Sequence, residues 1–176
     1  MTNYKPTDSR HDQLLELQER VSDWSYENFG QQLSKYDNVL NRHLNPLIGL
    51  NEEYFELVNS TSVSERNDAI GDIIIYLCDF TARLDIDLVV KVVEVKQNSL
   101  EYAMEQINHI TLKMHQGIRG YDDVDFARSE LLYYCQLLLA SLYSFHVDPI
   151  QLAVKTFNNI VSKRDWVSNP VTGEKE

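Results

Sequence analysis

The segment from Ile70 to Leu84 constrains the fold most, because its apolar residues leave almost no polar face on a helix. A helix that is apolar nearly all round has to be buried by other elements. Asp72 and Asp79 nevertheless lie inside this segment, and Glu65 and Asp68 precede them at spacings that place all four along one stripe. An isolated ionised carboxylate is very costly in such surroundings. We therefore expect the acids within the apolar stretch to face a cation, a hydrogen-bond donor or a water-filled cleft.

The scarcity of chain-breaking residues predicts an all-α fold. Only 6 Gly and 4 Pro occur in 176 residues, and long periodic segments run between them. We predict one domain over residues 1–176, built as a bundle of about six helices. The expected helices are about His11–Phe29, Leu47–Asn59, Glu65–Leu84, Asp87–His115, Phe126–His146 and Pro149–Trp166, with Gly30 ending the first, Pro46 opening the second, Asp87 and Asp148 as N-caps, and connectors at Gln31–Asn45 and Gln116–Asp123.

Two parts of the chain resemble each other and suggest a degenerate tandem repeat of a two-helix unit, over about 46–97 and 98–166. Aligning Asp87 with Asp148 sets Asp72 against Tyr133 and Ala69 against Glu130. The second copy would then have lost most of its acids and would supply packing surface. The alternative is that any two helical hairpins look alike at this level.

The charge of the chain excludes two classes of partner. Its formal net charge is −11, which repels phosphodiester backbones and anionic lipid, so we expect neither a nucleic-acid polymer nor a membrane as partner. Small phosphate ligands are compatible with this charge, because a bound divalent cation reverses the local field. Residues Met1–Arg10 contain no apolar signal core, and no apolar run is long enough to span a bilayer, which predicts a cytoplasmic protein.

The predicted second helix carries a partner for the acidic stripe. Glu52 and Glu53 precede Glu56 by four and three residues, so all three can converge on one side of that helix. Acids on two facing helices are a common way to hold hard cations in a bundle. Ligands that are all oxygen indicate Mg²⁺ or Mn²⁺, and a remaining carboxylate can orient or deprotonate a water molecule. The alternative for the three glutamates is a solvated acidic face.

These two segments resemble a known family. "GLNEEYFEL" followed by "NDAIGDIIIYLCDF" is similar to the all-α nucleoside triphosphate pyrophosphohydrolases of the MazG-like superfamily, which includes the dimeric dUTPases. The signature of that family is an EExxE helix followed by an ExxD helix. "WSYENFG", "LKMHQGIRG" and "VSKRDWVSNPVTG" also look like a MazG-like subgroup of phages and bacteria. The resemblance implies Mg²⁺-dependent cleavage of a (d)NTP to the monophosphate and pyrophosphate, by a homo-oligomer, expected to be a dimer.

The resemblance assigns roles to the acids of both helices. Glu52, Glu53 and Glu56 match EExxE, and Asp72 matches the aspartate of ExxD. Glu53, Glu56 and Asp72 would hold Mg²⁺, with Asp68 as a further ligand. Glu52, Glu53 or Asp68 would serve as catalytic acids, and either Glu52 or Asp68 would position the attacking water.

One position departs from the family pattern. Ala69 stands where the family has the glutamate of ExxD. Asp68 could cover the gap, as could Glu65 one turn earlier or Glu130 from the second copy. If nothing covers it, the chain would be a catalytically decayed relative that binds nucleotide for regulation or sequestration. A third alternative is a helical interaction protein whose acids are merely solvated.

A nucleoside triphosphate also needs cations for its phosphates and a flat wall for its base. Arginine presents a planar fork to phosphate oxygens, and an aromatic ring can stack on a base. The candidates for phosphate are Lys163 and Arg164, with Arg119 in the "GIRG" segment as a weaker one; those for the base are Trp24 and Phe29, with Asn28 at its edge. The alternatives are ordinary charges at the end of a helix and ordinary core aromatics.

Overall fold

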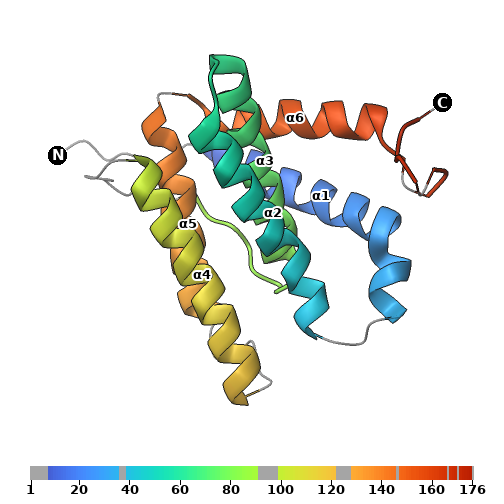
Figure 1. The fold of residues 1–176 in the computed structure, drawn as a ribbon, viewed down its shortest axis with the longest axis horizontal. Coiled ribbons are helices and arrows are strands. Elements are labelled where there is room, and N and C mark those ends of the chain that lie inside the picture. Colours follow the sequence, from blue (N-terminus) through green and yellow to red (C-terminus); the bar gives the residue numbers. More distant parts are fainter. Residues whose placement is uncertain are drawn as a thin grey trace.

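A computed structural model describes residues 8–35, 39–90, 99–121, 128–145, 147–165, 167–169 and 171–175. Within these ranges the chain is all-α, as predicted, and has no β-strand longer than a single bridge (Figure 1). The helices are α1 (Asp8–Lys35), α2 (Val39–Asn59), α3 (Val63–Ala82), α4 (Ser99–Tyr121), α5 (Arg128–Leu142) and α6 (Pro149–Lys163), with a short 3₁₀ turn at Tyr143–Phe145. The six-helix bundle expected from the sequence is therefore confirmed.

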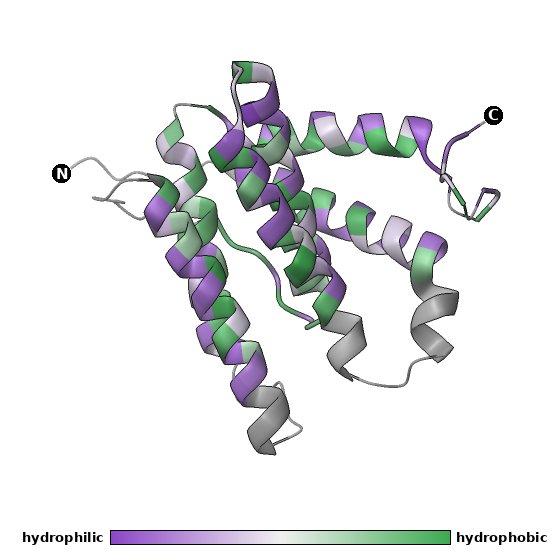
Figure 2. Ribbon diagram, viewed as in Figure 1, coloured by the Kyte–Doolittle hydropathy of each residue, from purple (hydrophilic) through white to green (hydrophobic). Residues whose placement is uncertain are grey.

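Helix α3 lies in the middle of the bundle. It packs against α2 and α6 most extensively, against α1 next, and also against α5 (Figure 1). Ile70, Ile73, Ile74, Leu77 and Phe80 are completely buried, as their continuous apolar run predicts. Burial of each such side chain contributes about 1.5–3 kcal/mol relative to exposure. Polar and apolar residues alternate around the surrounding helices (Figure 2), so one side of each can cover α3 while the other meets solvent.

Two glycines let neighbouring helices approach α3 closely. A Cβ atom added to Gly71 of α3 would lie 2.6 Å from the Thr156 Oγ1 atom of α6, and one added to Gly49 of α2 would lie 2.4 Å from the Cε1 atom of Tyr76. Both separations are shorter than side chains tolerate, so a larger residue at either position must displace its neighbour. Because Gly71 and Tyr76 flank Asp72 along α3, these contacts fix the surroundings of that acid.

The starts of α3 and α6 follow their sequence signals. Ser62 and Glu65 form a capping box at the start of α3, in which the Glu65 N–H donates to Ser62 Oγ at 3.1 Å and the Ser62 N–H donates to Glu65 Oε2 at 3.3 Å. Asp148 is the N-cap of α6, with Pro149 at its first position, which confirms the prediction for that helix.

Several predicted boundaries are wrong, because the helices continue through local breakers. Helix α1 continues past Gly30 to Lys35, and α2 begins at Val39, so Pro46 lies inside that helix rather than at its start. Helix α4 likewise continues through Gly117 and Gly120 to Tyr121, where we expected a loop. A glycine inside a helix costs only about 1 kcal/mol relative to alanine, which the rest of a long helix can offset.

The expected start of α4 is also wrong. Asp87 lies in a non-helical segment, residues 86–90, and α4 begins at Ser99. The buried side chain of Gln18 explains the extended backbone, because its amide replaces helical hydrogen bonds. Gln18 Nε2 donates to the Ile86 carbonyl at 2.6 Å, and the Leu88 N–H donates to Gln18 Oε1 at 3.1 Å. The Asp87 cap proposed for the internal repeat is therefore absent, whereas α4 does pack on α5 as α2 packs on α3.

Among the described residues, no single helix has the length and apolar composition needed to cross a membrane, and α5 with α6 meets that test only as a pair bent by 96°.

The close contact at Gly71 predicts a stability effect. Gly71→Leu should lower the free energy of unfolding by about 1–3 kcal/mol, because the new side chain meets Thr156 of α6. Leucine is a good helix former, so the loss would be steric. Urea unfolding of Ser64→Leu, at an exposed position of α3, should stay within about 0.5 kcal/mol of the wild type. Equal stability of Gly71→Leu and wild type would contradict the close approach of α3 and α6.

Candidate functional site

Five carboxylates from α2 and α3 interact electrostatically where these helices pack together. Burial raises the pKa of Glu53 to about 8, and the charges of Asp72, Glu56, Asp68 and Glu52 add to the effect in that order. Burial likewise raises the pKa of Asp72 to about 7, with further contributions from Asp68 and Glu56. We call Glu52, Glu53, Glu56, Asp68 and Asp72 the acidic cluster. The two helices thus bring together all the acids that the sequence analysis selected as metal ligands.

The acidic cluster concentrates negative charge in a partly buried place. Glu53 Oε2 is buried and has no hydrogen-bond partner. A buried carboxylate oxygen without a partner is unfavourable, and each cause of the Glu53 and Asp72 shifts acts in the same direction. Such a group is stabilised either by a proton or by a cation.

The donor chemistry of the cluster fits a hard divalent cation. Its ligands are all carboxylate oxygens, which Mg²⁺ and Mn²⁺ prefer. Among the residues that the structure describes, however, no three acidic, histidine or cysteine side chains stand in the arrangement of a formed metal site. The structure therefore shows a cluster with suitable donors, whose side chains would have to adjust around an ion.

The structure distinguishes among the three acids that could cover the departure at Ala69. Ala69 itself is buried in the core, at 1% exposure. Glu65 is held by the capping box and by the Thr61 N–H at 2.7 Å, a hydrogen bond that lowers its pKa. Glu130 pairs with Lys113 across α4 and α5, with 2.5 Å between Oε2 and Nζ. Asp68 is the one of the three that raises the pKa values of both Glu53 and Asp72, so it belongs to the cluster.

A pocket of about 630 Å³ adjoins the acidic cluster. Glu52 and Asp72 form part of its wall, and residues of α1, α2, α3, α6 and the C-terminal segment form the rest. The lining side chains from outside the cluster include Trp24, Phe29, Tyr76, Asp79, Arg83, Phe157, Arg164 and Thr172. Acids, aromatic rings and arginines from distant parts of the sequence therefore meet around one space.

The aromatic part of the wall is built around Trp24. Its ring meets the ring of Phe29 edge-on, at 5.7 Å between centroids, and the ring of Phe157 at 6.1 Å. Such edge-to-face contacts hold an aromatic ring in a defined orientation. Trp24 and Phe29, selected from the sequence as a wall for a base, thus do line the pocket, and Phe157 joins them.

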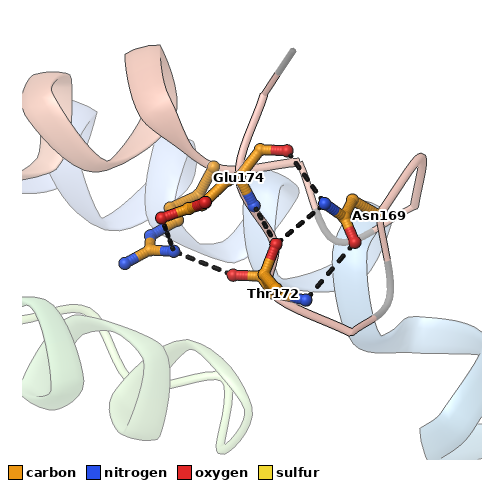
Figure 3. Close-up of polar contacts among 4 residues, drawn as sticks. Asn169, Thr172 and Glu174 are labelled. Carbon is orange, nitrogen blue, oxygen red and sulfur yellow. Dashed lines mark hydrogen bonds and ion pairs between the residues drawn. The ribbon is translucent and has the colours of Figure 1, made fainter.

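Arg164 reaches the pocket because the C-terminal segment folds back on the end of α6. The Arg164 Nη1 group donates to the Thr172 carbonyl at 2.8 Å, and the Asp165 N–H donates to the Gly173 carbonyl at 2.7 Å. Asn169 supports the turn by donating from Nδ2 to Thr172 Oγ1 at 2.8 Å (Figure 3). Arg164 is therefore held at the pocket by a hydrogen bond to the Thr172 carbonyl and by an ion pair with Glu174, whose Oε1 atom lies 4.0 Å from Nη1.

The pocket also contains an ion pair that the sequence analysis missed. Arg83 donates to both carboxylate oxygens of Asp79, at 2.9 and 2.8 Å, and to Ser25 Oγ at 3.0 Å. Asp79 thus meets a cation, as expected for an acid within the apolar stretch, and does not contribute to the pKa shifts of Glu53 or Asp72. The spacing of four residues between Asp79 and Arg83 is the sequence signal that could have predicted this ion pair. Tyr76 was missed as well, because an aromatic residue inside an apolar run reads as core.

Two predicted ligand residues do not line the pocket, and the side chain of a third is outside the described part of the chain. Asn28 Nδ2 donates to the Trp24 carbonyl at 2.8 Å, and Asn28 does not line the pocket. Lys163 is exposed in the last turn of α6 and does not line it either. Arg119 lies in α4, but its side chain is outside the described part of the chain.

The raised pKa values predict how stability changes with pH when no divalent cation is present. The folded-state pKa values of Glu53 and Asp72, about 8 and 7, exceed the ordinary values of 4.5 and 3.8 for these side chains, so protonation favours the folded state. The contribution is complete below about pH 4 and is lost as the pH rises through 7 and 8. The melting temperature in a chelating buffer should therefore fall between pH 6 and pH 9.

Glu53→Gln tests the source of this pH dependence. Removing the charge should flatten the fall in melting temperature, whereas Glu27→Gln, at an exposed position of α1, should leave it unchanged. A wild type whose melting temperature stays constant or rises from pH 6 to pH 9 would contradict the mutual repulsion within the acidic cluster.

Comparison with known proteins adds no family assignment: no protein-family model, curated protein or solved structure matches this chain. The acidic cluster and the pocket beside it are therefore the features from which a function can be inferred.

Proposed function

We propose that this chain is a Mg²⁺-dependent nucleoside triphosphate pyrophosphohydrolase, which cleaves a (d)NTP to the (d)NMP and pyrophosphate. One observation carries the proposal: Glu52 and Asp72 line the same pocket of about 630 Å³ as Trp24, Phe29 and Arg164. A nucleoside triphosphate presents a flat base at one end and a chain of anionic oxygens at the other. The aromatic wall suits the base, and the arginine and a cation held by the acids suit the phosphates.

The acidic cluster supplies the ligands for the cation in this proposal. Glu53, Glu56 and Asp72 would hold Mg²⁺, and Asp68, whose charge raises the pKa of both Glu53 and Asp72, would complete the set. When bound, Mg²⁺ supplies positive charge that offsets these acids and stabilises negative charge on phosphate oxygens. Mn²⁺ has the same preference for oxygen ligands and should substitute for it.

Glu52 is the best placed of the acids to act on the attacking water. It is exposed, lies in the wall of the pocket and interacts with Glu53, whereas Asp68 does not line the pocket. Its carboxylate would orient the water and accept its proton as the water oxygen bonds to the α-phosphorus. The bond from the α-phosphorus to the bridging oxygen breaks, and pyrophosphate leaves with that oxygen. Arg164 would bind the phosphate oxygens throughout.

A second candidate function is nucleotide binding without hydrolysis. The observation that favours it is the burial of Ala69, which leaves the position of the family's glutamate inside the core. In that case the pocket and the acidic cluster would bind a nucleotide with Mg²⁺ and release no product.

Pyrophosphate release from a panel of canonical and modified nucleotides with Mg²⁺ tests the first candidate. Glu56→Gln and Asp72→Asn should abolish release, and Glu52→Gln should lower kcat by about 10²–10⁴-fold, because it removes the group that accepts the proton. Glu27→Gln on α1 serves as the control for a change of surface charge and should keep full activity.

Each other outcome of this assay has a definite meaning. Full activity in both Glu56→Gln and Asp72→Asn would contradict the role of the acidic cluster. Calorimetry that shows Mg²⁺-dependent nucleotide binding, with no product over hours, would favour the second candidate. A protein without binding or turnover would instead be a helical protein with solvated acids.

The adjacent pair Lys163 and Arg164 offers a matched test of phosphate binding. Arg164→Met should raise the KM for the nucleotide by about tenfold or more, because it removes a charge-assisted hydrogen bond. Lys163→Met removes the same charge one residue away, outside the pocket, and should leave the KM unchanged. Equal effects of the two substitutions would indicate general attraction of an anion rather than a contact in the pocket.

A further inference from the structure

Arg164 is held at the pocket through one atom of its guanidinium group. In the part of the chain that the structure describes, both polar contacts of its side chain use Nη1, which donates to the Thr172 carbonyl at 2.8 Å and lies 4.0 Å from Glu174 Oε1. The side chain is 42% exposed and lines the pocket, so a ligand can reach it. The other two donor atoms, Nε and Nη2, are therefore available to that ligand.

Nε and Nη2 form the edge of an arginine that binds two oxygens at once. Their N–H groups are nearly parallel, which matches two oxygens of a carboxylate or of a phosphate. Arg83, in the same pocket, uses this edge on Asp79, where Nε donates to Oδ1 at 2.9 Å and Nη2 donates to Oδ2 at 2.8 Å. A contact at Nη1 thus restrains Arg164 without occupying the edge that suits a phosphate.

Asn169 fixes Thr172, whose carbonyl meets Arg164. The Asn169 Oδ1 atom accepts from the Thr172 N–H at 3.3 Å, and Nδ2 donates to Thr172 Oγ1 at 2.8 Å and to the Glu174 carbonyl at 3.3 Å (Figure 3). One amide side chain thus engages Thr172 at both its backbone and its hydroxyl. The position of the Thr172 carbonyl therefore depends on Asn169.

Backbone hydrogen bonds anchor the C-terminal segment to the end of α6. The Asp165 N–H donates to the Gly173 carbonyl at 2.7 Å, and the Lys175 N–H donates to the Lys163 carbonyl at 2.9 Å. Gly173 has a φ of 66°, a conformation that favours glycine. The segment is therefore held in place by its backbone as well as by the Arg164 side chain.

We propose that the C-terminal segment is part of the phosphate site and that Asn169 is a positioning residue for Arg164. This inference rests on the proposed function, in which Arg164 binds the phosphates of the nucleotide. Asn169 holds the Thr172 carbonyl, the carbonyl holds Nη1, and the Nε and Nη2 atoms donate to two oxygens of one phosphate group. An arginine side chain loses rotamer freedom when it binds a ligand, and one that is already restrained loses less.

The neutral carbonyl suits this task better than the Glu174 carboxylate. A carbonyl accepts a hydrogen bond from the guanidinium group without neutralising its charge. The Glu174 side chain is 72% exposed and its Oε1 atom lies 4.0 Å from Nη1, so this ion pair is weak in water. The positive charge of Arg164 thus stays available for a phosphate.

Calorimetry with Mg²⁺ and inorganic tripolyphosphate, which lacks base and sugar, tests the positioning role without turnover. Asn169→Ala should weaken binding by about three- to tenfold, because it removes hydrogen bonds that restrain Arg164. In the nucleotide assay it should raise the KM by the same factor and leave kcat unchanged. Val171→Ala, at an 85% exposed position of the same segment, should bind as the wild type does. Wild-type affinity in Asn169→Ala would overturn the proposal.

Two further comparisons separate positioning from a general effect on the segment. Thr172→Val removes the hydroxyl that Asn169 binds, whereas Thr172→Ser keeps it and should retain more of the affinity. In the Arg164→Met background, Asn169→Ala should cause no further loss of affinity, because Asn169 acts through Arg164. A further loss in that double variant would show that Asn169 acts without Arg164 and would overturn the proposal.

Failure of this inference can be told apart from failure of the proposed function. Tripolyphosphate binding that depends on Asn169 and Arg164, with no pyrophosphate released from any nucleotide, would contradict hydrolysis and support the positioning role. Hydrolysis with a KM that Asn169→Ala leaves unchanged would do the reverse. A wild type that neither binds tripolyphosphate nor hydrolyses a nucleotide would overturn both.

Discussion

The partial burial of a carboxylate on an apolar helix is the constraint on which the candidate site of this protein depends. Helix α3 is covered by neighbours on several sides, and Asp72 lies on it between completely buried isoleucines and Gly71. The charge of Asp72 adds to the effect of burial in raising the pKa of Glu53, and one carboxylate oxygen of Glu53 has no hydrogen-bond partner. Burial of so much apolar surface can support one unfavourable cluster. Clusters of this kind, with strongly shifted pKa values beside a pocket, are typical of functional sites.

The rest of the fold positions this cluster and the pocket beside it. Gly49 and Gly71 allow α2 and α6 to approach α3. The Gln18 amide of α1 binds the extended segment that follows α3. Asp79, further along α3, forms an ion pair with Arg83. It is therefore neutralised, unlike the acids of the acidic cluster. The fold of the C-terminal segment onto α6 then places Arg164 at the pocket.

The sequence predicted the parts of the site that depend on helical periodicity. The spacing of Glu52, Glu53 and Glu56, and the aspartates in an apolar run, were enough to expect the acidic cluster. Contacts between distant segments could not be predicted in the same way. Gln18 binds residues 68 and 70 positions away, and Arg164 depends on a turn around Asn169. The helix boundaries at Gly30 and Pro46 were misplaced because a long helix can contain an interior glycine, at about 1 kcal/mol, or an interior proline, at about 3 kcal/mol. The boundary at Asp87 was misplaced because the Gln18 amide binds the extended backbone of that segment.

Calorimetric titration of the ligand-free protein with Mg²⁺ and Mn²⁺ tests the central claim most directly. At pH 8 the account predicts saturable binding with release of protons, because Glu53 and Asp72 are partly protonated in the ion-free protein and must ionise to bind a cation. Buffers of different ionisation enthalpy reveal that release, and Asp72→Asn should abolish the binding. Saturable binding that Asp72→Asn leaves intact, or no binding at millimolar cation, would contradict the account.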